Sequence, residues 1–456
     1  MFRKYLIYSY LFLFPGYLVA QTSDTRYFLP DTLSLKESIH IGLENNRNYQ
    51  KALLDEDKAK FQRNEIRGAG LPQLSAYGNY NNFVDVFPQA IPGGGFFGGD
   101  PEDINVIAFG VPQSLKAGLQ LNQLIFSNSY LIGLKAAKTG EEFYRLLAQQ
   151  SEENVIYEIS MNYLSTIQLH LQRENLLSNL DQLSGLEKIL KAQYENDLAR
   201  KVDWNRVQVN LTSIRSELEN LDIAIYQREG YLKLVMGIPV GTPIQLDRSI
   251  GSFHPSLDSF EVSELNVQDR RDIQILEVQE KLYDYELKNI KAGHQPQLVG
   301  FADWNKNAFA TEFDFMQGSK VWYQGFLVGL KLEIPIFDGM QTKYKAAQSR
   351  VKSQQLQLDR SLAIDAAELE YQSALNNYYS SKSTLKSLEG NLALARDILR
   401  ETSLLYKEGL SPLTDLLEAE ATQRQAQANY NNQLIQVRIA QLEILNSSGR
   451  IKSLIQ

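Results

Sequence analysis

The stretch Phe326–Gly339, FLVGLKLEIPIFDG, decides the fold class of this chain. One series of alternating positions is wholly apolar and the other includes a lysine and a glutamate. The first is Phe326, Val328, Leu330, Leu332, Ile334 and Ile336, and the second is Leu327, Gly329, Lys331, Glu333 and Pro335. Because successive side chains of a strand point to opposite faces, this pattern predicts a strand with one apolar face. A soluble sheet on a core and a lipid-facing outer-membrane strand both satisfy it.

This strand is the second of a pair whose two members flank the loop Lys306–Lys320. Another strand pair is predicted earlier in the chain, at Leu74–Val84 and Ala117–Phe126. No predicted helix covers the resulting four strands, which favours the outer-membrane alternative. Four strands cannot close a barrel, because the smallest have about eight. We therefore expect several copies of the chain to pool their strands. Asn82–Gly110 and Lys306–Lys320 are predicted to be loops, the first with a glycine-rich run that lacks the order of a phosphate-binding loop.

The chain contains two copies of one unit, because four landmarks recur in the same order at a similar offset. Ile66–Leu74 is echoed by Ile290–Leu298, Leu119–Phe126 by Leu330–Phe337, Tyr194–Asp203 by Tyr406–Asp415, and Met236-Gly237 by Gly449. The predicted domains are a signal peptide at 1–20, a first repeat at 21–238, a linker at 239–262, a second repeat at 263–449 and a short tail at 450–456.

Each repeat is predicted to hold a helix, two strands, a very long helix, a turn and a last helix. The expected helices are Ser34–Arg67, Asn128–Tyr194, Val202–Met236, Ser263–Lys291, Met340–Tyr406 and Pro412–Ser447. The long ones reach about 100 Å at 1.5 Å per residue and need helical partners alongside them. Their Ala-, Gln-, Asn- and Leu-rich composition suits a wall wetted on both sides. The predicted fold class is thus α+β, with a long α-helical barrel and a transmembrane β-barrel.

Composition excludes several other classes. The 456 residues include no cysteine, which excludes disulfides and thiolate metal sites, and the net charge of −8 gives no support for nucleic-acid binding. The four histidines are not at metal-ligand spacing, and no nucleophile triad or nucleotide loop is found, so we expect no cofactor and no enzyme. A basic start, an apolar run at Leu6–Phe14 and Ala20 before Gln21 predict an exported protein rather than an N-terminal anchor.

Together these landmarks resemble the TolC family of outer-membrane efflux proteins over nearly the whole mature chain. The matching pieces are a first-helix signature at Leu33–Ile39 with Asn45-Asn46, helix-to-strand prolines at Pro72 and Pro296, a strand exit at Ile334–Gly339 with a degenerate partner at Ile125–Asn128, and a turn with Tyr406, Gly409 and Asp415–Ala419. Each piece alone is weak, and their order, duplication and spacing carry the resemblance.

The resemblance implies an outer-membrane homotrimer with most of its helical part in the periplasm. Each protomer would give four strands to a twelve-stranded barrel in the lipid and its helices to a tunnel. A periplasmic adaptor (membrane fusion) protein would dock at the tip and connect the tunnel to an inner-membrane pump. The chain would be a passive, gated exit duct for efflux or type I secretion. The alternative is a periplasmic coiled-coil scaffold or adaptor without a channel, which leaves the paired strands unexplained.

The resemblance places Asp415 and Glu418 at the channel constriction of the periplasmic tip. The two acids are three residues apart, so they share a helix face. Acids in the first turn of a helix also offset its dipole, which is the alternative explanation. Asp203 and Tyr406 correspond to a latch between the two hairpins, although Ser411 stands where the family has an arginine. Arg200 and Lys201 are candidates to replace that arginine, and a packed aromatic is the alternative role for Tyr406.

Aromatic residues near the predicted strands are candidates for the membrane interface, where barrels carry aromatic girdles. The set comprises Tyr77, Tyr80, Trp304, Trp322 and Phe326, with Phe83 and Tyr323 nearby. Scattered surface aromatics are the alternative explanation.

Overall fold

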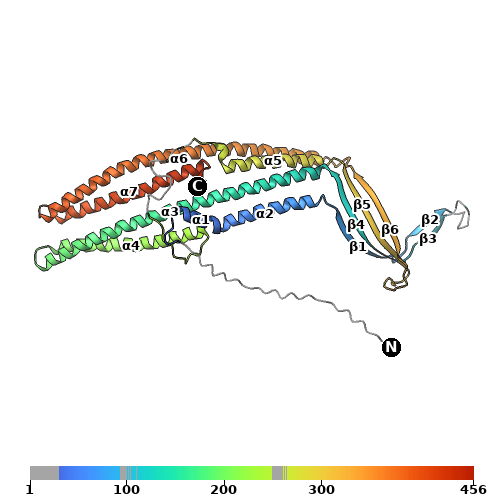
Figure 1. Ribbon diagram of the computed structural model, residues 1–456, viewed down its shortest axis with the longest axis horizontal. Helices are drawn as coiled ribbons and strands as arrows, with labels where there is room; N and C mark the ends of the chain where they lie inside the picture. Colours follow the sequence, from blue (N-terminus) through green and yellow to red (C-terminus); the bar gives the residue numbers. More distant parts are fainter. Residues whose placement is uncertain are drawn as a thin grey trace, which may run out of the picture.

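The computed structural model describes residues 30–455 apart from 93–99, 101, 103, 109, 249–259, 261 and 263. It is a long rod of helices that carries a small sheet at one end and two helical hairpins at the other (Figure 1). The helices are α1 (Leu35–Asn45), α2 (Arg47–Gly68), α3 (Asn128–Glu195), α4 (Lys201–Met236), α5 (Arg271–Ala292), α6 (Gln341–Lys407) and α7 (Leu413–Ser447), with short 3-10 turns η3 (Val267–Asp269) and η4 (Ile451–Leu454).

The two longest helices confirm the length prediction. α3 has 68 residues and α6 has 67, which gives each a length of about 100 Å. In each half of the chain, shorter helices lie end to end beside a long one (Figure 1). α2 and α4 contact α3, and α5 and α7 contact α6. None of the described helices is both long and apolar enough to cross a membrane.

The first helix differs from its prediction, because it is broken at Asn46. The Asn46 side chain accepts hydrogen bonds from the backbone N–H groups of Asn48 and Tyr49 and so caps α2. Its amide nitrogen donates to the carbonyl oxygen of Val235 at 2.7 Å. An asparagine that satisfies backbone groups with its side chain competes with the helix ladder. α5 also differs, since it begins at Arg271 rather than Ser263.

The sheet is antiparallel in the order β1-β4-β5-β6, formed by β1 (Gln73–Asn82), β4 (Gln113–Ser127), β5 (Gln297–Ala310) and β6 (Tyr323–Glu333). Two predicted loops need correction. The segment after β1 contains a separate two-stranded ladder, β2 (Pro88–Pro92) with β3 (Ile104–Ala108), and β5 continues to Ala310. The glycine-rich run Gly93–Gly99 lies outside the described residues.

The core at the middle of the rod joins both halves of the chain. Its buried members include Ile39 of α1, Ile156 of α3, Met236 of α4 and Leu442 of α7. The Tyr163 hydroxyl donates to the carbonyl oxygens of Leu33 and Asp247, at 3.0 and 2.8 Å. These bonds hold the segment before α1 against the segment after α4.

In both halves of the chain, the last long helix is followed by a glycine in the left-handed backbone conformation. Gly237 follows α4 with a φ of 74°, and Gly449 follows α7 with a φ of 72°. A Cβ on Gly237 would lie 2.2 Å from the Asn45 carbonyl oxygen, and one on Gly449 would lie 2.9 Å from that of Asp269. Only glycine combines this conformation with so close an approach. The repeat boundaries remain a prediction, and the signal peptide lies outside the described residues.

Candidate functional site: the helical tip and the two faces of the sheet

The two tip turns have the same backbone conformation despite different sequences. Asp197 after α3 has a φ of 59° and Gly409 after α6 has a φ of 72°. The next residue in each turn donates its N–H back to the helix, Leu198 to Gln193 at 2.7 Å and Leu410 to Leu405 at 2.8 Å. This is the geometry of a left-handed helix cap, which aspartate tolerates better than most residues. The side chains of Leu198 and Leu410 are 80% and 76% exposed at the end of the rod.

Asp415 and Glu418 lie exposed in the first turns of α7. The Ser411 hydroxyl donates to Asp415 Oδ2 at 3.0 Å, so this serine orients the first carboxylate. Leu413 and Leu416, on another side of the same helix, are buried in the tip core with Leu190 and Val207. The carboxylates therefore point away from that core, as a role in a constriction requires.

Asp203 is held by a neighbour on its own helix turn rather than by Tyr406. Arg200 donates to both carboxylate oxygens, at 2.9 and 3.3 Å. No hydrogen bond joins Tyr406 to Asp203 in the part of the chain that the structure describes. The two are nonetheless close enough to interact, because burial, and then the charge of Asp203, raise the pKa of Tyr406. The latch between Asp203 and Tyr406 thus stays a prediction. In the structure, the carboxylate of Asp203 pairs with Arg200.

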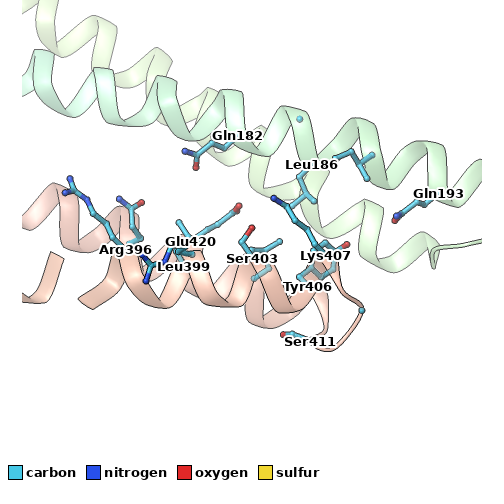
Figure 2. A pocket seen from close by; sticks show the side chains of 16 residues that line it. Gln182, Leu186, Gln193, Arg396, Leu399, Ser403, Tyr406, Lys407, Ser411 and Glu420 are labelled. Carbon is cyan, nitrogen blue, oxygen red and sulfur yellow. The ribbon is translucent and has the colours of Figure 1, made fainter. Parts of the chain in front are cut away.

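A cleft of about 920 Å³ separates the two hairpins near the tip (Figure 2). Gln182, Leu186 and Gln193 of α3 form one wall, and Arg396, Ser403 and Lys407 of α6 lie opposite. Glu420 of α7 also lines the cleft. Burial raises the pKa of Glu420, and nearby Arg424 partly offsets this effect. The sequence analysis missed these residues, although Leu416, Glu420 and Gln423 follow the spacing of one helix face.

Packing of the tip should therefore weaken as pH rises, through Glu420. A carboxyl whose pKa is raised by folding binds its proton more tightly in the folded tip than in the unfolded chain. Its contribution to the stability of the folded tip is therefore fully present below the ordinary pKa of 4.5 and is lost as pH rises through the raised pKa of the folded state. We expect hydrogen-exchange protection of α6 and α7 near the cleft to fall as pH rises above 4.5, after correction for the intrinsic exchange rate. Glu420→Gln should remove this pH dependence, whereas Glu408→Gln at the exposed turn should retain it. An identical pH profile in wild type and Glu420→Gln would contradict the assignment.

The sheet has one apolar and one polar face, as its register shows. One row of the apolar face runs Leu74, Leu121, Ala302, Val328, and the next runs Ala76, Leu119, Trp304, Phe326. The row between them on the other face runs Ser75, Gln120, Asp303, Leu327. Val328 and Phe326 are 64% and 69% exposed, so nothing in the described part of this chain covers the apolar face there. This arrangement confirms the alternation predicted from Phe326–Gly339 for the part that forms β6.

The aromatic candidates divide between the two faces. Trp304 and Phe326 are register neighbours on the apolar face. Tyr80 lies on the same face near the loop end, with its ring edge-on to Phe313 and Phe315. Trp322 immediately precedes β6. Tyr77 lies on the polar face, where its hydroxyl donates to Asp303, so it does not share the face of Trp304 and Phe326. The membrane-interface role of the whole set stays a prediction.

Comparison with known proteins shows which proteins this chain resembles in sequence and in fold. Residues 262–450 match the family model described as outer membrane efflux protein. This match, over the second half of the chain, supports the resemblance to the TolC family of outer-membrane efflux proteins. The chain is 23% identical over 405 residues to the alkaline protease secretion protein AprF of Pseudomonas aeruginosa, covering 85% of this chain and 78% of that protein.

Solved structures of outer-membrane proteins have the same fold. The outer membrane protein VceC of Vibrio cholerae matches with a TM-score of 0.70 at 15% identity, over 91% of this chain and 96% of that one. The MtrE outer membrane channel of Neisseria gonorrhoeae, solved in its open state, matches with a TM-score of 0.69 at 19% identity, over 92% and 90%. The family consists of transport channels of the outer membrane, which favours a channel over a periplasmic scaffold.

Proposed function

We propose that three copies of this chain assemble into a channel that crosses the outer membrane and continues as a helical tunnel through the periplasm. The observation that carries the proposal is the four-stranded sheet, whose apolar face is uncovered by the described residues and whose outer strands β1 and β6 each have one unpaired edge. An unpaired edge is a template for another strand. Pairing β6 of one copy with β1 of the next would leave no edge exposed and would form a twelve-stranded barrel.

In this assembly the polar face of the sheet lines the water-filled interior and the apolar face contacts lipid. Trp304, Phe326, Tyr80 and Trp322 would lie at the lipid-facing side of the barrel. The helices would continue the wall of the duct, with the two hairpins at its far end. This chain would provide no energy for transport, since its sequence contains no recognisable nucleotide-binding loop, so an inner-membrane pump would supply it.

The periplasmic tip is the proposed gate and docking end. Asp415 and Glu418 of three protomers would bring six carboxylates around one axis, and the Asp203–Tyr406 region would hold neighbouring hairpins together. The exposed Leu198 and Leu410 offer apolar contacts to a periplasmic adaptor protein. A secretion role like that named for AprF, or an efflux role like that named by the family model, would use the same duct. Residues 1–20 would direct export, and 21–238 and 263–449 would be the repeats.

Membrane fractionation followed by bilayer recording tests the proposal. We expect the protein to resist washing at high salt, to be extracted by detergent as a trimer, and to conduct ions across a planar bilayer. The periplasmic scaffold alternative predicts release by washing and no conductance. A monomer that remains in solution without detergent would contradict the channel.

A further inference from the structure

A chain of hydrogen bonds crosses the polar face of the sheet near its middle. The Tyr77 hydroxyl on β1 donates to Asp303 Oδ2 on β5 at 2.7 Å, across the intervening strand β4. Asn305 Nδ2 donates to the other carboxylate oxygen, and Asn307 Nδ2 donates to Asn305 Oδ1 at 2.7 Å. Both oxygens of Asp303 therefore accept a hydrogen bond, so its carboxylate is held in one orientation.

Two glycines make room for the asparagine that holds this carboxylate. Gly118 of β4 and Gly325 of β6 flank Asn305 in one row of the sheet. A Cβ on Gly118 would lie 2.9 Å from Asn305 Cβ, and one on Gly325 would lie 2.9 Å from Asn305 Oδ1. Asn305 is 8% exposed. Side chains at either glycine position would displace a donor to Asp303.

A cation lies on the other side of Tyr77. The Nζ atom of Lys116 on β4 is 5.4 Å from the centroid of the Tyr77 ring, so the ring stands between an ammonium and a carboxylate. Within the four strands, the remaining charged side chains of this face are Lys331 and Glu333 at the helical end, which pair with each other at 2.9 Å. Lys116 and Asp303 are thus the charges of the middle section.

We propose that Lys116 and Asp303 together set the charge preference of the barrel section of the channel. The proposal rests on the proposed function, in which the polar face lines the pore. Threefold repetition would place three carboxylates and three ammonium groups around the pore, in rows of the sheet that are four residues apart along β4. Fixed charges on a pore wall change the local concentration of passing ions according to sign. Asp303 favours cations and Lys116 favours anions, and their balance is the specificity-determining feature.

The test is the reversal potential of single channels in a KCl gradient. Asp303→Asn keeps the size of the side chain and an acceptor for Tyr77, and should lower the ratio of potassium to chloride permeability about two- to threefold. Lys116→Gln should raise this ratio by a similar factor, and the double variant should return close to the wild-type value. Asp314→Asn is the matched control, because Asp314 lies in the loop after β5 and pairs with Lys320. That variant should leave the ratio unchanged.

Detergent-resistant trimers establish that each variant has assembled before it is recorded. If Asp303→Asn fails to assemble, the shift caused by Lys116→Gln decides the question alone, since the described contact of Lys116 is with the Tyr77 ring. Unchanged reversal potentials in the assembled single variants would overturn the proposal while leaving the channel intact. Absence of any current from wild type would instead overturn the proposed function.

Discussion

Val328→Lys is expected to abolish stable insertion of the protein into the outer membrane. Val328 lies on the uncovered apolar face of β6, between the rows of Phe326 and Leu330. A lysine on the lipid-facing side of a barrel costs about 2–4 kcal/mol near the middle of the membrane. In a trimer this penalty would occur three times. The amount of trimer recovered from the outer-membrane fraction by detergent should therefore fall to near zero.

Leu327→Lys is the matched control for this substitution. Leu327 is the adjacent residue of the same strand but lies on the polar face, opposite Asp303 in the register. A lysine there would face water and a carboxylate, so trimer recovery should stay near the wild-type level. Equal losses in the two variants would show that β6 does not separate lipid from water in the way its alternation predicts.

Neutralising the tip acids should weaken channel block by multivalent cations at least about tenfold. Six carboxylates converging on one axis would attract a trivalent cation strongly, since the interaction energies of the charges add and are only partly screened. Asp415→Asn with Glu418→Gln removes the charges, while the amide oxygen introduced by the first substitution still accepts from Ser411, the donor seen at 3.0 Å. The measurement is the concentration of hexaamminecobalt(III) that halves the single-channel current.

Glu408→Gln provides the control for the tip experiment. Glu408 lies in the turn after α6, exposed and outside the first turns of α7. Its neutralisation should change the blocking concentration by less than about twofold if the constriction is formed by the α7 acids. Block that is as strong in Asp415→Asn/Glu418→Gln as in wild type would assign these acids to helix capping instead.

Most of the architecture could be predicted because its signals are local and repeated. The long helices follow from extended periodic segments between clear end signals, and α3 and α6 end within one residue of their predicted limits. The break at Asn46 could not be predicted in this way, because it depends on Val235, which lies 189 residues away in the chain. The β2–β3 ladder escaped notice because proline and glycine dominate its surroundings.

The functional residues were harder to predict, since they depend on register between strands and on contacts between hairpins. The side of the sheet on which Tyr77 lies was nevertheless available from alternation: Leu74 and Tyr80 have one parity and Tyr77 has the other. The pairing of Tyr77 with Asp303 spans 226 residues and needs the order of the strands. Glu420 was missed for a similar reason, because its burial arises where α7 lies beside another hairpin.

Cysteine crosslinking between the two edge strands tests the central claim most directly, since the chain has no native cysteine. Ala76→Cys on β1 would be combined in turn with Phe326→Cys, Val328→Cys or Leu330→Cys on β6. Within one chain these strands are separated by β4 and β5, so a disulfide between them requires a second copy. We predict that at least one pair, oxidised in intact outer membranes, gives covalent species that stop at the trimer. Monomer alone for every pair, or a ladder continuing beyond three chains, would contradict a closed barrel of three protomers.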